Sequence, residues 1–198
     1  EALAAKYTAG LKTDTEKGIA LLKEALSASC RHPTMPPLGE KVPPNRNLED
    51  EDLLASGTGW CNEQARVFIR LCQVSGMQAR MIHLFGQNHT VAEFYADGKW
   101  AMVDATNLFV ARGDDGKLLS AAECHDGGAG QRSYAEAKVE RMRELMSLSA
   151  DELGFPDEAS AANWREGAAK LEVEELAVRP VYFGVINYPL SESAREVK

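Results

Sequence analysis

The spacing of apolar residues predicts an amphipathic helix in the first half of the chain. From Ala65 to Ser75 the small or apolar side chains return every three to four residues, which is the repeat of one helix face. Gly76 follows, at the place where helices commonly end in a left-handed residue. The pattern places Cys61 in the first turn of this helix, directly after a segment that contains Gly57 and Gly59.

A change to alternating positions predicts strands after this helix. The segments 78–85, 90–96 and 99–104 are rich in β-branched and aromatic residues. Asp97-Gly98 joins the last two segments and is a strong signal for a two-residue hairpin turn. We therefore expect an antiparallel sheet beside the helix.

The hairpin turn also sets the register of its two strands. With residues 97 and 98 in the turn, Val91 faces Asp104, and His89 lies two residues further along on the same face. His89 and Asp104 then become diagonal neighbours, whereas a slip of one residue would put them on opposite faces. We expect the face that carries them to pack on the Cys61 helix.

The flanking segments favour further helices. Thr13 with Glu16, and Ser149 with Glu152, have the pattern of a capping box, and apolar spacing predicts a helix over about 135–146. The acidic run 49–52 fits the solvated start of a short helix that Asn47 can cap. The aromatic run 179–189 fits either an edge strand or the wall of a groove.

Prolines interrupt the chain upstream of Cys61. Five prolines between residues 30 and 45 exclude a regular helix or a central strand there. A long loop just before a candidate nucleophile is one way to wall a substrate cleft, and His32 in this loop is expected to face solvent.

Length and charge limit the classes of function. The chain has 198 residues, for which we expect a single domain with a sizeable core. A formal net charge of −8 does not favour nucleic acid or an anionic membrane as partner, and no apolar stretch has transmembrane length. The chain starts at Glu1 without a methionine, which fits an extracytoplasmic mature form or a shortened chain and leaves the compartment open.

Three side chains carry the candidate chemistry: Cys61, His89 and Asp104. The positive end of a helix favours a thiolate at Cys61, and a nearby cation lowers a thiol pKa further. Taken alone, Cys61 is more simply a buried small side chain, but an imidazole and a carboxylate on one ribbon face favour an active site. His83 is the rival of His89, and we interpret it as a hydrogen-bonded histidine between apolar strand neighbours.

The cysteines do not indicate a disulfide framework or a zinc site. The four cysteines have neither a disulfide pattern nor a zinc spacing, and we predict no metal and no cofactor. Cys72 falls on the buried helix stripe, so a core thiol is expected. Cys30 and Cys124 lie in irregular sequence, and their pairing in an oxidising compartment is left open.

Four short motifs follow one another in the order and spacing of a known family. They are Gly59-Trp60-Cys61, Gly76 to Arg80, His89 to Glu93, and Gly98 to Thr106. Together they span about a quarter of the chain and resemble the core of the transglutaminase-like superfamily. Val91 stands where this family often has Trp, and Gln78 where it often has Pro. These two differences affect side-chain packing and the turn more than the chemistry.

The resemblance implies an α+β fold with a papain-like, transglutaminase-like core. N-terminal helices, with the nucleophile helix among them, would pack on an antiparallel sheet, and a mostly helical C-terminal addition would follow. We expect the catalytic core at about 47–112 and the extension at about 113–198, within a single domain over 1–198.

The resemblance also implies roles: Cys61 as nucleophile, His89 as its base and Asp104 as the group that orients His89. The backbone N–H of Cys61 is expected to supply part of an oxyanion site, with Trp60 and Asn62 as candidates for oxyanion or substrate contacts.

The implied reaction is amide acyl transfer through a thioester, and we expect hydrolysis of a peptide or isopeptide bond in a protein or peptide substrate. The calcium sites of the animal crosslinking enzymes have no counterpart that we can match. The alternatives are a protein-crosslinking transglutaminase with an amine acceptor and a catalytically silent binding or scaffold domain. A glycan amidase is less favoured, because the chain has no paired C-x-x-C module.

Overall fold

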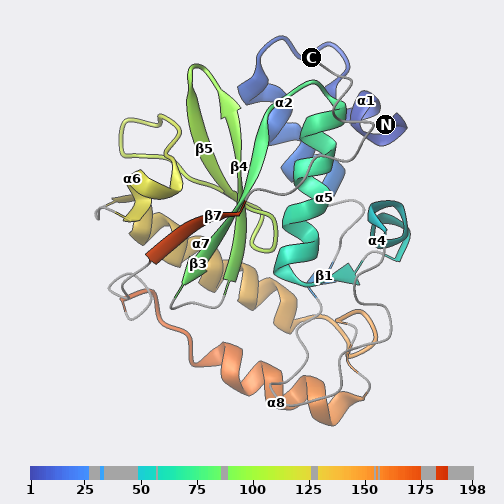
Figure 1. The fold of residues 1–198 in the computed structure, drawn as a ribbon. Helices are drawn as coiled ribbons and strands as arrows, with labels where there is room; N and C mark the ends of the chain where they lie inside the picture. The colour runs from blue at the N-terminus through green and yellow to red at the C-terminus, as the bar shows by residue number, and fades with distance from the viewer. Residues whose placement is uncertain are drawn as a thin grey trace.

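A computed structural model describes residues 1–26, 32–33, 49–56, 58–85, 89–125, 129–153, 155, 157–174 and 182–186. Most of the proline-rich segment, Cys30 and Asn47 lie outside the described residues. Among the described residues, five strands form one antiparallel sheet in the order β6-β5-β4-β3-β7 (Figure 1). Their bounds are β3 Ala79–Phe85, β4 His89–Ala96, β5 Lys99–Asp104, β6 Phe109–Val110 and β7 Tyr182–Ile186.

Helices cover both faces of this sheet. Helix α5 lies on one side of it and α6 on the other, with α7 behind it in Figure 1. The helices are α1 Ala2–Thr8, α2 Asp14–Ala20, the π-helix η1 Leu21–Leu26, α4 Asp50–Ser56, α5 Cys61–Val74, α6 Ala121–His125, α7 Ala129–Met146 and α8 Glu158–Ala169. This mixed architecture agrees with the predicted α+β, transglutaminase-like core. Within the described part of the chain, we find no helix with the length and apolar character needed to cross a bilayer.

The hairpin turn has the predicted geometry. Asp97 and Gly98 have φ angles of 53° and 82°, as a type I′ turn requires at both central positions. Ala96 therefore pairs with Lys99 and Ala92 with Val103, which confirms the predicted register of β4 and β5. Thr15 on α2 donates its hydroxyl to the Asp97 carboxylate at 2.6 Å, so the turn is also tied to the N-terminal helices.

The prediction that α5 packs on the sheet face that carries His89 and Asp104 was wrong. Helix α5 packs on the face that carries Ala92, Phe94, Ala101 and Val103. There the rings of Phe68 and Phe94 meet edge to face, with their centroids 6.1 Å apart. The opposite face, with Val91 and Met102, packs under α6 and α7 instead. Because both faces of the ribbon are buried, apolar alternation does not identify the face that α5 covers. Small alanine side chains on the α5 face let the helix approach the sheet closely.

The N-terminal segment folds largely as its pattern indicates. The capping box at Thr13 and Glu16 is present at the start of α2. The apolar residues that follow, Leu21, Leu22 and Leu26, are buried, although they lie in a π-helix rather than in a continued α-helix. The acidic run is not simply solvated, because Asp50 accepts from Arg66 and Arg70 of α5, at 2.8 and 3.2 Å.

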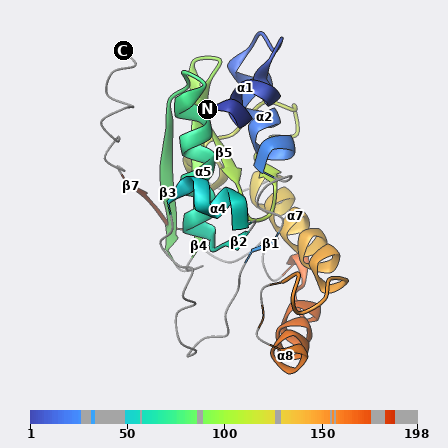
Figure 2. The same ribbon diagram turned by 90° about the vertical axis from the view of Figure 1, so that its right-hand side faces the viewer.

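The region after the hairpin adds helices and one strand. The Ser149–Glu152 capping box forms in the turn that precedes α8. Buried apolar residues hold α7 and α8 together, and both extend below the sheet in Figure 2. Of the two alternatives for the aromatic run 179–189, the edge strand is present, because β7 pairs antiparallel with β3. The division into a core at about 47–112 and an extension at about 113–198 of a single domain stays a prediction.

A short parallel pair of strands lies immediately upstream of α5. Strand β1, His32–Pro33, pairs with β2, Thr58–Gly59, and Trp60 and Cys61 follow directly. The beginning of the proline-rich segment is thus placed beside the chain that leads into the candidate nucleophile.

Candidate active site

Cys61 is the first residue of helix α5, as the sequence pattern predicts. Trp60 precedes it as the N-cap residue in an extended conformation, and the Trp60 N–H donates to the buried Glu63 carboxylate at 2.8 Å. The helix start therefore has a defined geometry. A thiol at this position lies at the positive end of the helix dipole, which favours its ionised form. Cys61 is half-buried, so its sulfur is not sealed into the core.

The hairpin brings His89 and Asp104 together on one face of the sheet. His89 begins β4, Asp104 ends β5, and His89 Nε2 lies 2.7 Å from Asp104 Oδ2. The Cys61 thiol is hydrogen-bonded to the His89 side chain. Thiol, ring and carboxylate thus form one chain of contacts.

Asp104 lies in a cage of hydrogen-bond donors. Its Oδ1 atom accepts from the backbone N–H groups of Thr106 and Asn107 at 2.9 and 3.1 Å. Its Oδ2 atom accepts from Asn107 Nδ2 at 2.6 Å and Tyr134 Oη at 2.8 Å, in addition to His89. The carboxylate is fully buried. Burial alone would raise its pKa, but His89 and these donors hold the pKa of Asp104 well below its usual range.

The same contacts move the pKa values of His89 and Cys61 in opposite directions. Burial lowers the pKa of His89, but the Asp104 carboxylate outweighs it and raises the pKa to about 9. Burial raises the pKa of Cys61, but hydrogen bonds from His89 and the Thr90 backbone, with the His89 charge, bring the net pKa below its usual value. The arrangement therefore favours a thiolate beside an imidazolium.

The other cysteines have the opposite behaviour. Burial raises the pKa of Cys72 far above its usual value and that of Cys124 to about 12. Cys72 is a fully buried core residue of α5, as expected. Cys124 is a free thiol, and the open question of its pairing with Cys30 involves a residue outside the described part of the chain.

Three further residues from the sequence analysis lie in the described part of the chain. His83, the rival histidine, lies in β3, and its Nδ1 atom is 3.2 Å from the Thr90 hydroxyl, in agreement with a hydrogen-bonded strand histidine. Trp60 and Asn62 flank Cys61 on either side of the helix start, and their oxyanion or substrate role stays a prediction.

Sequence reasoning missed Asn107 and Tyr134, which both donate to Asp104. Asn107 had a local signal, since an aspartate commonly accepts from backbone N–H groups two or three residues later. Tyr134 had none, because it lies thirty residues further along the chain on α7.

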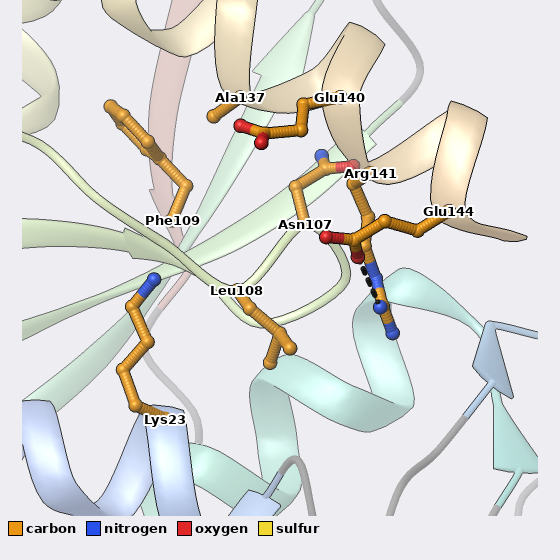
Figure 3. A pocket seen from close by; sticks show the side chains of 8 residues that line it. All are labelled: Lys23, Asn107, Leu108, Phe109, Ala137, Glu140, Arg141 and Glu144. Carbon is orange, nitrogen blue, oxygen red and sulfur yellow. Dashed lines mark hydrogen bonds and ion pairs between the residues drawn. The ribbon is translucent and has the colours of Figure 1, made fainter.

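A pocket of about 240 Å³ lies next to this cage and shares Asn107 with it (Figure 3). Helix α7 supplies one wall, Lys23 of η1 lies opposite, and Asn107 and Leu108 come from the turn after β5. Two cations, Lys23 and Arg141, balance two anions, Glu140 and Glu144, and Arg141 is paired with Glu144 at 2.8 Å. None of the three candidate catalytic residues lines this pocket, so it is not the reaction site.

The described residues contain no candidate metal centre. In that part of the chain, no three His, Cys, Asp or Glu side chains gather in an arrangement that could hold a metal ion.

Comparison with known proteins gives a match at the level of family. No curated protein and no solved structure matches the chain significantly. A family model of the transglutaminase-like superfamily matches residues 1–105, which is more than half of the 198 residues and includes Cys61, His89 and Asp104. The chain therefore belongs to the transglutaminase-like superfamily, in which cysteine-dependent acyl transfer is the typical chemistry.

Proposed function

We propose that this protein is a cysteine enzyme that transfers acyl groups from amides through a thioester. The observation that carries the proposal is the contact chain from Cys61 through His89 to Asp104, with a lowered thiol pKa at one end and a buried carboxylate at the other. This combination matches the requirements of an activated nucleophile with a base and an orienting group.

The first half of the reaction forms the thioester. The Cys61 thiolate attacks the amide carbonyl, and negative charge develops on the carbonyl oxygen. The Cys61 backbone N–H at the helix start is suited to donate to that oxygen, and one such donor is worth about 2.7 to 4 kcal/mol in enzymes where it was removed. As the C–N bond breaks, His89 gives its proton to the leaving amine, which leaves the acyl group on sulfur.

The second half of the reaction regenerates the thiolate. The now neutral His89 takes a proton from the acceptor, whose oxygen or nitrogen attacks the thioester carbonyl, and the Cys61 thiolate departs. Asp104 supports the positive charge on His89 whenever the ring carries the proton. Its five hydrogen-bond donors hold its oxygens in fixed directions, so the ring is held in one orientation and tautomer.

For the acceptor, we propose water, and thus hydrolysis of a peptide or isopeptide bond. Cys61 is half-buried and the His89 side chain is 12% exposed, so both remain within reach of solvent. The alternative is a crosslinking enzyme, in which a primary amine takes the acyl group. A catalytically silent scaffold domain is disfavoured, because such a domain has no need for a thiol with a lowered pKa.

Thiol labelling tests whether Cys61 is activated. The protein is treated with iodoacetamide at pH 6, and the labelled cysteines are counted by peptide mass spectrometry. Cys61 is expected to react faster than Cys30, Cys72 and Cys124, because among the described cysteines its pKa is the one that is lowered. Equally slow labelling of all four cysteines would contradict the proposal and favour the scaffold alternative.

A competition experiment tests the acceptor. A glutamine- and lysine-containing protein substrate is incubated in ¹⁸O-water with a labelled primary amine. Incorporation of ¹⁸O into new carboxyl groups indicates hydrolysis, and incorporation of the amine label indicates crosslinking. The Cys61→Ala variant is the control, and products that survive this substitution would remove Cys61 from the mechanism.

A further inference from the structure

Tyr134 reaches the candidate active site from helix α7. It lies outside residues 1–105, the segment that matches the family model. The residue is 6% exposed, and its ring packs against Phe109, with ring centroids 5.4 Å apart. Its hydroxyl donates to Asp104 Oδ2 at 2.8 Å. Burial raises the pKa of Tyr134 well above its usual value, so the hydroxyl stays protonated and remains a donor.

The atom that Tyr134 contacts is the one that faces His89. Asp104 Oδ1 is held by two backbone N–H groups, whereas Oδ2 receives His89 Nε2, Asn107 Nδ2 and the Tyr134 hydroxyl. Three donors therefore share the charge of a single carboxylate oxygen. Each donor that is present leaves less negative charge for the other two, because hydrogen bonds to an ionised group draw on the same electron density.

We propose that Tyr134 is a positioning residue that takes up part of the negative charge of Asp104 and so limits how strongly this carboxylate holds the His89 imidazolium. The inference rests on the proposed function of the triad. It extends the working site beyond the segment matched by the family model, to a residue of the C-terminal helices.

This role has a consequence for both steps of the reaction. His89 must release its proton to the leaving amine, and an imidazolium that is held too tightly is a poorer acid. The titratable groups that act on His89 are Asp104 from β5 and Cys61 from α5, and Tyr134 from α7 acts on Asp104 through its hydroxyl. The Tyr134 hydroxyl is thus placed to keep His89 within a useful range of acidity.

Tyr134 is the donor in this cage that can be removed with least change to the backbone. Asn107 holds Asp104 through its backbone as well as its side chain, and the next residue, Leu108, has a φ of 50°. A substitution at Asn107 would therefore disturb a constrained turn. Tyr134→Phe removes one hydroxyl and keeps the ring that packs against Phe109.

The test compares Tyr134→Phe with Tyr95→Phe in the full chain. Tyr95 is a matched control, because it is 37% exposed, lies in the same sheet and packs edge to face on Trp100, away from the triad. The pKa of His89 is measured by NMR titration of its ring protons, and the rate of Cys61 alkylation is measured as a function of pH. Thermal unfolding of each variant provides the measure of a purely structural effect.

We expect Tyr134→Phe to raise the pKa of His89 by about half a unit and to slow amide turnover by up to about threefold, the limit that a half-unit change in the acidity of the proton donor allows. Tyr95→Phe should change neither quantity. A His89 pKa that is unchanged or lowered in Tyr134→Phe, with or without a lower melting temperature, would overturn the inference. Failure of the proposed function is a separate result, because it would appear in the wild-type protein as slow alkylation of Cys61.

Discussion

Helix α5 carries two cysteines whose surroundings differ at its two ends. Cys61 lies at the first residue of the helix, half-buried, and His89 lowers its pKa against the effect of burial. Cys72 lies near the other end, fully buried in the core, and burial raises its pKa. The helix presents both sulfurs, but only one meets an imidazole. The comparison shows that a hydrogen-bonded partner decides the ionisation of a thiol in this fold, and that burial alone acts in the opposite direction.

The strongest way to sharpen this comparison is to remove each sulfur in turn. Cys61→Ala is expected to lower amide turnover by about 10⁴-fold or more, since removal of a nucleophile leaves only binding and oxyanion stabilisation. Cys72→Ala should retain turnover, but lower the free energy of unfolding by about 1 kcal/mol through the lost core contact. Turnover and urea denaturation measure the two effects. A turnover loss in Cys72→Ala as large as that in Cys61→Ala would contradict the assignment.

The next largest effect is expected at the carboxylate. Asp104→Asn removes the charge that raises the pKa of His89, so the His89 pKa should fall and the support that protonated His89 gives to the Cys61 thiolate should weaken. Turnover is expected to drop by roughly 10³- to 10⁴-fold, as in other triads that lose this carboxylate. At pH 6 the labelling of Cys61 should then slow, so that its advantage over Cys72 becomes smaller. The matched control is Asp97→Asn in the hairpin turn, which should leave both labelling and turnover close to wild type.

The pH dependence of labelling separates the two sulfurs without a mutation. A lowered Cys61 pKa means that its thiolate persists below the usual thiol range, so its alkylation should remain fast as the pH falls to about 6. Amide turnover should decline as the pH rises through about 9, because His89 then loses the proton that the leaving amine requires. Cys72 should react only when the protein unfolds. A Cys61 profile that begins only above pH 8 would show an ordinary thiol.

The smallest effect is expected at the helix start. Glu63 is buried and accepts the Trp60 N–H at 2.8 Å, which fixes the geometry of the residue before Cys61. Glu63→Gln weakens this contact and should lower stability by about 1 kcal/mol, the usual value of a capping interaction. The preference for Cys61 over Cys72 in labelling should change by less than about threefold. Thermal unfolding and peptide mapping on the same sample measure both, and a complete loss of the preference would place its origin in the cap rather than in His89.

Local sequence signals predicted several parts of the site because each depends on neighbouring residues. The stripe that ends at Gly76 placed Cys61 at the start of α5. Asp97-Gly98 set the register, and this put His89 and Asp104 on one face. Those relations follow from helix and hairpin periodicity, which are properties of short segments.

Long-range packing decided what these signals left open. The sheet is buried on both faces, so the pattern did not say that α5 covers the side of Phe94 rather than the side of Val91. Likewise, Asp50 has the sequence context of a solvated helix start, yet it pairs with Arg66 and Arg70 of a different helix. Neither contact has a periodic signature.

The sequence alone therefore determined the order of thiol, ring and carboxylate along the chain and the register that joins the last two. Only the tertiary structure brought Cys61 to His89 and placed Tyr134 of α7 on Asp104. The physical reason is one of range. Periodicity and turn geometry act within a segment, whereas the distance between a helix start, a strand end and a later helix is set by how the whole core packs.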